Sequence, residues 1–213
     1  MNRPRVLLAD DHFVVAEGLR SLLAPHFDVV GIASDGRELL AAARALDPDV
    51  AVLDISMPSL SGLEAARQLR GANSRAKLVF LTMHREVAYA ARALEAGASA
   101  FVLKHSAASE LVTAIREALK GGKYITPQFA GDLLDSFRHG PPTGAEALGE
   151  LTPRQREVLQ LIAEGRSAKQ IAAALHISRR TAEFHKSRLM ETLGVQNTAE
   201  LIQYAIRNGV CSV

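Results

Sequence analysis

Five polar side chains each follow a short apolar run, and their types suit phosphoryl chemistry. Asp10 and Asp11 close the run "VLLADD", while Asp54, Thr82 and Lys104 close "DVAVLD", "KLVFLT" and "FVLK". Adjacent buried carboxylates repel each other, so the pair either lies in an open turn or has a cation beside it. If the five side chains meet, their oxygens suit Mg²⁺ and Asp54 can act as a nucleophile toward phosphorus. The metal, Lys104 and Thr82 would then stabilise the phosphoryl oxygens.

The apolar runs predict five parallel strands, because segments with helical spacing separate them. The β-branched-rich runs cover residues 5–10, 28–33, 49–54, 77–82 and 99–104. This alternation is typical of an α/β domain with a doubly wound, flavodoxin-like (βα)5 sheet of order 2-1-3-4-5. The first, third, fourth and fifth strands are neighbours in that order. Their carboxyl ends meet at the edge where such sheets bind ligands, so we expect the five polar side chains to converge.

The helical segments between these runs are amphipathic. Residues 12–24 place Val15, Leu19, Leu22 and Leu23 on one stripe. A stripe of this spacing is typical of a helix that covers one face of a sheet. We therefore expect these four side chains to lie on one face of a helix.

A change of pattern after residue 121 predicts a domain boundary. Gly121 and Gly122 end the last helical segment of the alternating region, and residues 140–149 are rich in Gly and Pro. Between them, Pro127 to Phe137 has the pattern of a short helix. The expected division is a first domain at 1–121, a linker at 122–149 and a second domain at 150–213.

The second domain contains start and stop signals for four short helices and no strand pattern. Side chains that can cap a helix N-terminus precede each helical pattern, and glycines at 165 and 194 follow two of them. The capping residues are Thr152 with Gln155, Ser167 with Gln170, Ser178, and Asn197 with Glu200. We expect a small all-α domain whose segments 168–175 and 179–193 form a helix-turn-helix.

The second helix of this pair has an unusual outer face. Glu183, Phe184 and Ser187 point away from the core-facing Ala182 and Leu189 on a helical projection. Arg180 and Arg188 flank them. An exposed phenylalanine between arginines indicates either a contact with another protein surface or a recognition helix that reads the DNA major groove.

Composition limits the class and location of the protein. The 213 residues carry a formal charge of +2, with 16 basic and 16 acidic residues in 1–138 against 9 and 6 in 150–213. The single cysteine, Cys211, is typical of a reducing compartment. The sequence has neither an apolar run of membrane-spanning length nor the pattern of a leader, so we expect a cytoplasmic protein without membrane contact.

The first domain resembles a bacterial response-regulator receiver. Asp10-Asp11, "LDISMPSLSG" around Asp54, "LTMH" with Thr82 and "FVLK" with Lys104 carry this resemblance. It implies that a sensor histidine kinase phosphorylates Asp54 with Mg²⁺. The metal ligands it implies are Asp10, Asp11, Asp54 and the backbone carbonyl of Ser56, with Asp10 acting through water. It also makes Thr82 and Phe101 the switch pair that responds to the phosphoryl group.

Other phosphoryl-transfer families fit the pattern less well. A haloacid-dehalogenase-type phosphatase needs a second acid two residues after its nucleophile, where this chain has Ser56. A nucleotide hydrolase needs a P-loop, and "GGKY" lacks its spacing. One departure from many receivers is His105, which takes the place of a proline after Lys104. The resemblance therefore does not predict the backbone conformation after Lys104.

Residues 151–205 closely resemble the LuxR-type helix-turn-helix of NarL/FixJ-type response regulators. The resemblance includes "LTPRQREVL", Thr181 and "LGV". It implies binding to double-stranded DNA, with the base-facing positions at Glu183, Phe184 and Ser187. The side chains expected to contact phosphates are Lys169, Arg180, Thr181, Lys186 and Arg188. Family members frequently have lysines and valine at the base-facing positions, so the resemblance does not predict which DNA sequence this chain binds.

The two resemblances together predict a transcription factor that phosphorylation of Asp54 controls. We expect a homodimer on paired half-sites, with Leu201, Ile202 and Ala205 either at the dimer contact or in the helical core. The only reaction expected is acceptance and loss of the protein's own phosphoryl group. Two alternatives stay open: a receiver that controls a protein partner, and a DNA-binding regulator that does not depend on phosphorylation.

Overall fold

The computed structural model describes residues 3–83, 87–131, 151–208 and 210. They belong to two compact units, 1–140 and 141–213, and each unit is described by itself. The division predicted at residues 121 and 149 stays a prediction. Within the described residues, each helix is too short or too polar to cross a bilayer.

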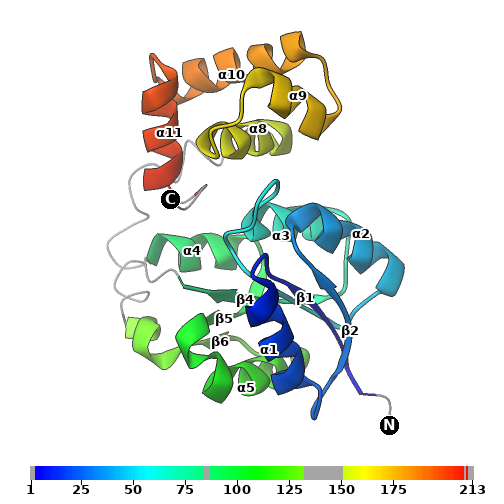
Figure 1. Ribbon diagram of the computed structural model, residues 1–213. Coiled ribbons are helices and arrows are strands. Elements are labelled where there is room, and N and C mark those ends of the chain that lie inside the picture. Colours follow the sequence, from blue (N-terminus) through cyan, green and yellow to red (C-terminus); the bar gives the residue numbers. More distant parts are fainter. Residues whose placement is uncertain (1–2, 84–86, 132–150, 209, 211–213) are drawn as a thin grey trace. The chain divides into compact units, whose positions relative to one another are not determined.

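The first unit is a parallel sheet with helices on both faces (Figure 1). The strand order β2-β1-β3-β4-β5-β6 confirms the predicted flavodoxin-like order and adds a sixth strand. The strands are β1 Arg5–Ala9, β2 Asp28–Ala33, β3 Val50–Leu53, β4 Lys77–Thr82, β5 Ala98–Leu103 and β6 Tyr124–Ile125. The helices are α1 Phe13–Leu23, α2 Gly36–Leu46, α3 Gly62–Gly71, α4 Val87–Glu95 and α5 Ala107–Leu119, with a short 3₁₀ turn η1 Lys104–Ser106.

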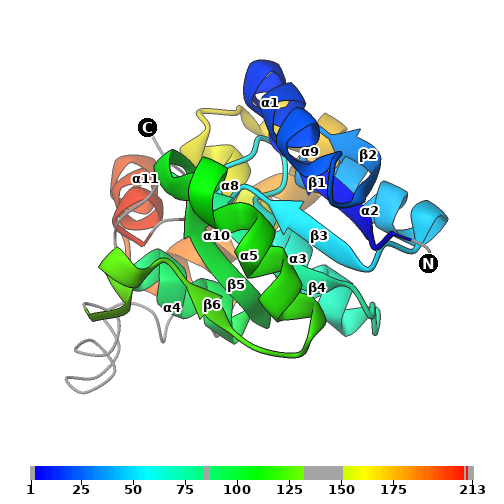
Figure 2. The same cartoon turned by 90° about the horizontal axis from the view of Figure 1, so that it is seen from below.

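Alternation along the strands produces two separate cores. In β1, Val6 and Leu8 pack with α1 and α5, whereas Leu7 and Ala9 pack with α2 and α3. The same two-residue period continues in β3, β4 and β5, because successive side chains in a strand point to opposite faces. Figures 1 and 2 show α1 and α5 on one face and α2, α3 and α4 on the other. Both faces of the central strands are therefore buried, as is usual in parallel sheets.

The inner face of α1 differs from the predicted stripe by one position. Ala16, Leu19 and Leu23 are buried, but Val15 is 37% exposed. The helix begins at Phe13, and Val14 in its first turn is exposed as well. Apolar spacing alone does not show where along such a stripe a helix loses contact with the core.

Strand β6 adds an edge to the sheet that the sequence analysis did not predict. Tyr124–Ile125 pairs in parallel with β5, so the segment directly after the predicted boundary at residue 121 belongs to the sheet. Residues 127–131 are helical, as predicted from Pro127 onward. The rest of that predicted helix, 132–137, lies outside the described residues.

A close backbone approach fixes the loop that carries Asp54. The Gly62 amide donates a hydrogen bond to the Ile55 carbonyl at 2.9 Å, at the first residue of α3. A Cβ atom on residue 62 would lie 1.9 Å from the carbonyl oxygen of Asp54. Any larger residue would therefore displace the end of β3, and the glycine is a steric requirement of the loop.

The second unit consists of four helices in its described part: α8 Pro153–Ala163, α9 Ala168–Leu175, α10 Arg179–Leu193 and α11 Thr198–Arg207. The predicted caps are confirmed. Thr152 with Gln155 and Ser167 with Gln170 each form a complete capping box, and Ser178 caps the third of these helices. Such caps satisfy amide groups that have no partner within the helix.

The core of this unit uses one stripe from each helix. Val158, Leu159 and Leu189 are fully buried, and so are Leu201 and Ala205 of α11. The two α11 side chains therefore fill the bundle core of the monomer, which was one of the two roles predicted for them. Ile202 is only partly buried and remains available at the surface.

Candidate functional site: an acidic pocket and an arginine-flanked helix

Four strands deliver the polar side chains to one edge of the sheet. Asp10 follows β1, Asp54 follows β3, Thr82 ends β4 and Lys104 follows β5. The Asp54 amide donates to the Ala9 carbonyl at 2.8 Å, so the ladder between β1 and β3 extends into the pocket and brings Asp10 and Asp54 together. The convergence expected from the strand order is observed for Asp10, Asp54 and Lys104.

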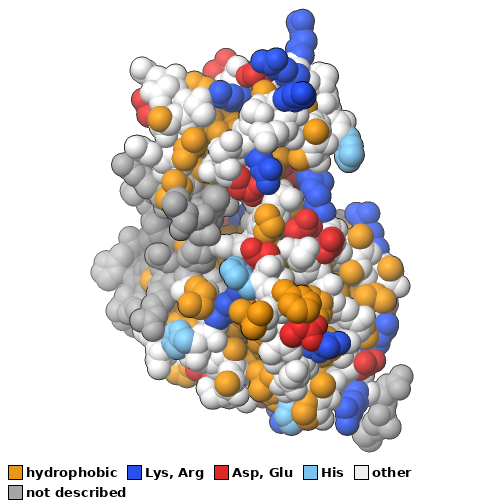
Figure 3. Space-filling view, in the orientation of Figure 1, with side chains coloured by type: hydrophobic (Ala, Val, Ile, Leu, Met, Phe, Trp, Pro, Cys, Tyr) orange, Lys and Arg blue, Asp and Glu red, His pale blue; other side chains and the backbone are white. Residues whose placement is uncertain are grey.

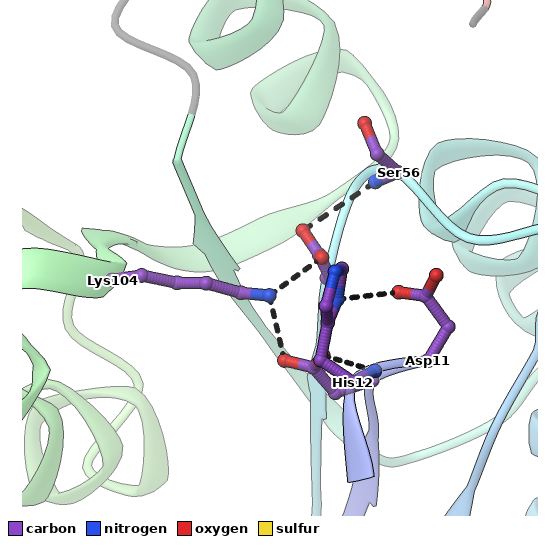
Figure 4. A network of polar contacts seen from close by, with 6 residues as sticks. Asp11, His12, Ser56 and Lys104 are labelled. Carbon is purple, nitrogen blue, oxygen red and sulfur yellow. Dashed lines mark hydrogen bonds and ion pairs between the residues drawn. The ribbon is translucent and has the colours of Figure 1, made fainter. Parts of the chain in front are cut away.

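Lys104 links the two buried acids. Its Nζ lies 2.7 Å from Oδ2 of Asp10 and 2.7 Å from Oδ2 of Asp54. All three side chains are nearly inaccessible to solvent, and Figure 4 shows Lys104 reaching across from β5 to the two carboxylates. An ammonium between two carboxylates offsets the repulsion that would otherwise oppose their burial.

Burial and charge act in opposite directions on these groups. Burial raises the pKa of Asp54 above its ordinary value, and Asp10 raises it further, although Lys104 acts to lower it. For Lys104, burial lowers the pKa, but the charges and hydrogen bonds of Asp54 and Asp10 together raise it above the ordinary value. The lysine thus stays charged, and a further cation beside Asp54 would favour the ionised, nucleophilic carboxylate.

The carboxylates also form a cluster that suits a divalent cation. One ligand atom from each of Asp10, Asp11, His12 and Asp54 lies within 4.8 Å of the others. Asp11 is partly exposed, so an ion can reach it from solvent. Three hard carboxylates at the mouth of a pocket match the ligands and open positions that Mg²⁺ prefers. The donor set therefore fits the predicted metal.

His12 was missed by the sequence analysis. Its Nδ1 lies 3.0 Å from Oδ1 of Asp11 and 3.4 Å from Oδ1 of Asp10 (Figure 4). Its amide also donates to Oδ1 of Asp10 at 3.0 Å. A histidine directly after two acids could have been considered from the sequence, because it stands at the same strand end. Its ring partly balances the charge of the exposed acid when it is protonated.

The remaining predicted residues lie around the same edge. The Ser56 amide is 3.4 Å from Oδ1 of Asp54, which places this backbone beside the buried carboxylate (Figure 4). Thr82 and Phe101 are both fully buried on the adjacent strands β4 and β5. Their roles as a switch pair, and that of the Ser56 carbonyl as a metal ligand, stay predictions.

Exposed apolar side chains beside the pocket also escaped the sequence analysis. Phe13 is 75% exposed, Val14 83% and Met83 69%. They directly follow His12 and Thr82 in the chain, so they border the acidic pocket.

Helix α10 presents the predicted outer face. Phe184 is 59% exposed, and Glu183 and Ser187 are exposed beside it, whereas Ala182 and Leu189 are buried. Lys and Arg side chains gather over α9 and α10 in Figure 3. The exposed basic residues on these two helices are Lys169, Arg179, Arg180 and Arg188. An aromatic ring among cations fits a surface that contacts nucleic acid.

Three of the residues predicted to contact phosphates either bond to another side chain of the unit or are only partly exposed. Thr181 Oγ1 lies 2.8 Å from Ser178 Oγ in the helix cap, and Arg188 pairs with Glu191 at 3.0 Å. Lys186 is half-buried. The pair of Arg188 with Glu191 is fully on the surface, where such pairs contribute little and open easily. Contacts of these residues with DNA stay predictions.

The comparisons with known proteins agree with both sites. A model described as "Response regulator receiver domain" matches residues 6–116, and one described as "Bacterial regulatory proteins, luxR family" matches 149–205. The transcriptional regulatory protein MctR of Rhizobium johnstonii is 37% identical over 210 residues, which cover 98% of this chain and 95% of the relative. LiaR of Bacillus subtilis is 38% identical over 208 residues, covering 96% and 97%. The chain is a LuxR-type two-component response regulator.

A solved structure supports the same family. It contains two RcsB dimers bound to two parallel DNAs, is 29% identical to this response regulator and has a TM-score of 0.61. The match covers 95% of this chain and 98% of that one. The acidic pocket therefore belongs to a receiver, and the arginine-flanked helix belongs to a LuxR-type DNA-binding domain of a transcriptional regulator.

The central ion pair of the receiver leads to a test of stability. Replacing Lys104 with methionine leaves two buried carboxylates without their common partner, so we expect Lys104→Met to lower the free energy of unfolding at neutral pH by about 3 kcal/mol. Added Mg²⁺ should restore part of this loss. Urea unfolding followed by circular dichroism measures it. The matched control is Lys120→Met, whose pair with Glu117 is exposed and should contribute less than about 1 kcal/mol. An equal loss of unfolding free energy in both variants would contradict the role of Lys104 as the common partner of the two buried acids.

Proposed function

We propose that a sensor histidine kinase phosphorylates Asp54 and that this phosphorylation controls dimerisation and DNA binding by the C-terminal domain. The observation that carries the proposal is the pocket in which Lys104 Nζ lies 2.7 Å from both Asp54 and Asp10. A buried nucleophilic carboxylate with an ammonium and a cluster of metal-binding oxygens beside it has what phosphoryl transfer requires.

In the proposed reaction, an oxygen of Asp54 forms a bond to phosphorus while the bond between phosphorus and the imidazole nitrogen of the kinase breaks. Lys104 is charged and within reach of the phosphoryl oxygens at this position, so it stabilises their negative charge. Asp10, Asp11, Asp54 and the Ser56 carbonyl would hold Mg²⁺, which supplies further neutralisation of that charge. Water later hydrolyses the acyl phosphate, so the protein acts on its own phosphoryl group.

The proposed response starts at Thr82. Thr82 is the last residue of β4, at the same sheet edge as Asp54. Its hydroxyl would donate to a phosphoryl oxygen, while the ring of Phe101 on β5 would pack behind it. The phosphoryl group carries about −1.5 to −2 charges and three acceptor oxygens, and it replaces the single negative charge of the Asp54 carboxylate. Such a change biases a two-state surface rather than building a new one.

The proposed output is binding of a homodimer to paired DNA half-sites. RcsB dimers bound to DNA in a related structure support this output. In this chain, Glu183, Phe184 and Ser187 would face the bases, and Lys169, Arg180, Thr181, Lys186 and Arg188 would contact phosphates. One small domain makes few phosphate contacts, so two copies are needed for strong specific binding. The proposed DNA ligand and the single cysteine of the chain support a cytoplasmic location.

The first test of this function follows Asp54 itself. After incubation with acetyl phosphate and Mg²⁺, intact-mass spectrometry should show one added phosphoryl group on the wild type and none on Asp54→Asn. Phosphorylation should strengthen DNA binding of the wild type about 5- to 150-fold, measured by fluorescence anisotropy. Asp28→Asn, which changes an exposed acid on β2, should behave as wild type. DNA affinity that is the same with and without the phosphoryl group would favour the phosphorylation-independent alternative.

The second test separates base reading from phosphate contact. In a binding-site selection, Phe184→Ala should lose about 1 kcal/mol of preference at one thymine-containing position, because its ring is expected to contact a thymine methyl group. Arg188→Ala should instead weaken binding to all sequences alike and reduce the salt dependence by about one phosphate contact. If Phe184→Ala keeps the wild-type preference at every position, the assignment of its ring is wrong. Binding that does not weaken with salt would favour a protein partner over DNA.

A further inference from the structure

The segment Tyr124–Phe129 lies outside the matched receiver model, which ends at residue 116, yet it is built into the receiver core. Its first two residues form β6, in which Tyr124 and Ile125 pair with Ala100 and Phe101 of β5. Strand β5 carries the predicted switch residue Phe101 and ends beside Lys104. The segment therefore adjoins both residues through which β5 takes part in the proposed reaction.

Thr126 ties this segment to the end of β5. Its amide donates to the carbonyl of Phe101 at 3.0 Å. Its hydroxyl accepts from the amide of Leu103 at 3.2 Å and donates to Oε2 of Glu110 on α5 at 2.8 Å. The residue is fully buried, so its bond with Leu103 is shielded from water, whereas the bond with Glu110 is partly buried. Because Leu103 directly precedes Lys104, the hydroxyl holds the strand end from which Lys104 reaches Asp54.

Phe129 continues the contact to the switch residue. Its ring stacks on that of Phe101, with a centroid separation of 5.5 Å and an interplanar angle of 23°. Phe101 is fully buried and Phe129 is 3% exposed, both in the core between the sheet and α2, α3 and α4. Packed interiors contain few voids, so the ring of Phe101 cannot change position unless Phe129 moves with it.

We propose that Tyr124–Phe129 is the element through which the receiver transmits the state of Asp54 to the chain that leads to the DNA-binding domain. Thr126 acts as a positioning residue for Lys104, and Phe129 follows the ring of Phe101. The inference rests on the proposed function, because it requires phosphorylation of Asp54. Linkage makes the coupling reciprocal, so a change in this segment also alters acceptance of the phosphoryl group.

Hydrogen–deuterium exchange of the full-length protein tests the role of Phe129. With acetyl phosphate and Mg²⁺, amide exchange of residues 124–129 in the wild type should change by at least about fivefold. In Phe129→Ala and in the better-filled Phe129→Leu, Asp54 should still gain a phosphoryl group, but the change in exchange should fall below about twofold. Phe27→Ala is the matched control: Phe27 is 4% exposed in the opposite core, and its loss should leave the response intact.

A second pair of variants tests the positioning role of Thr126 by the rate at which Asp54 is phosphorylated. Thr126→Val keeps the shape but removes the hydroxyl, and it should slow phosphorylation of Asp54 by acetyl phosphate about tenfold or more. Thr126→Ser restores a hydroxyl and should recover most of the rate, which a loss of packing alone would not explain. Equal rates in Thr126→Val and the wild type would overturn the positioning role.

The outcomes separate this inference from the proposed function. Full retention of the exchange response in both Phe129 variants, with a phosphorylated wild type, overturns the inference alone. A wild type that accepts no phosphoryl group overturns the proposed function as well. Loss of the response in the Phe129 variants, with retention in Phe27→Ala, supports the inference.

Discussion

The ion pair of Lys104 with Asp10 and Asp54 is the interaction on which the receiver depends. Two carboxylates are buried at the edge of a parallel sheet, where their repulsion and the loss of hydration would both favour protonation. The ammonium, 2.7 Å from each, keeps this edge compact and charged. In the proposed reaction, a divalent ion and a phosphoryl group would take over the interactions that the lysine makes with the two acids.

The packing of the sheet provides a route by which the proposed phosphorylation would produce a structural response. Each strand that ends at the pocket is buried on both faces, so β4 and β5 can change only together with the helices and strands packed on them. The edge strand β6 and the ring of Phe129 form part of that packing. The receiver and the DNA-binding domain belong to separate compact units. In the proposed mechanism, the segment Tyr124–Phe129, anchored on β5, carries the response toward the second unit.

Much of this structure could be predicted because its signals are local. Capping residues such as Thr152 and Ser178 depend on short-range hydrogen bonds, so the helix starts were predicted correctly. The pocket edge was predicted from the alternation of strands and helices, because a parallel sheet of this order brings the carboxyl ends of its strands together. The failures are long-range. The exposure of Val15, the pairing of β6 and the stacking of Phe129 depend on which residues of distant segments meet, and a short apolar pair such as Tyr124–Ile125 has no periodicity to identify it.

The central claim is that Lys104 occupies the place between the acids until a metal ion and a phosphoryl group arrive. A crystal structure of the full-length protein with Mg²⁺ and beryllofluoride, a stable mimic of the phosphoryl group, tests it most directly. The account predicts the ion bound by Asp11, Asp54 and the Ser56 carbonyl, with the Lys104 ammonium moved onto a fluorine atom. A structure in which Lys104 still joins Asp10 to Asp54, with the ion bound elsewhere, would contradict it.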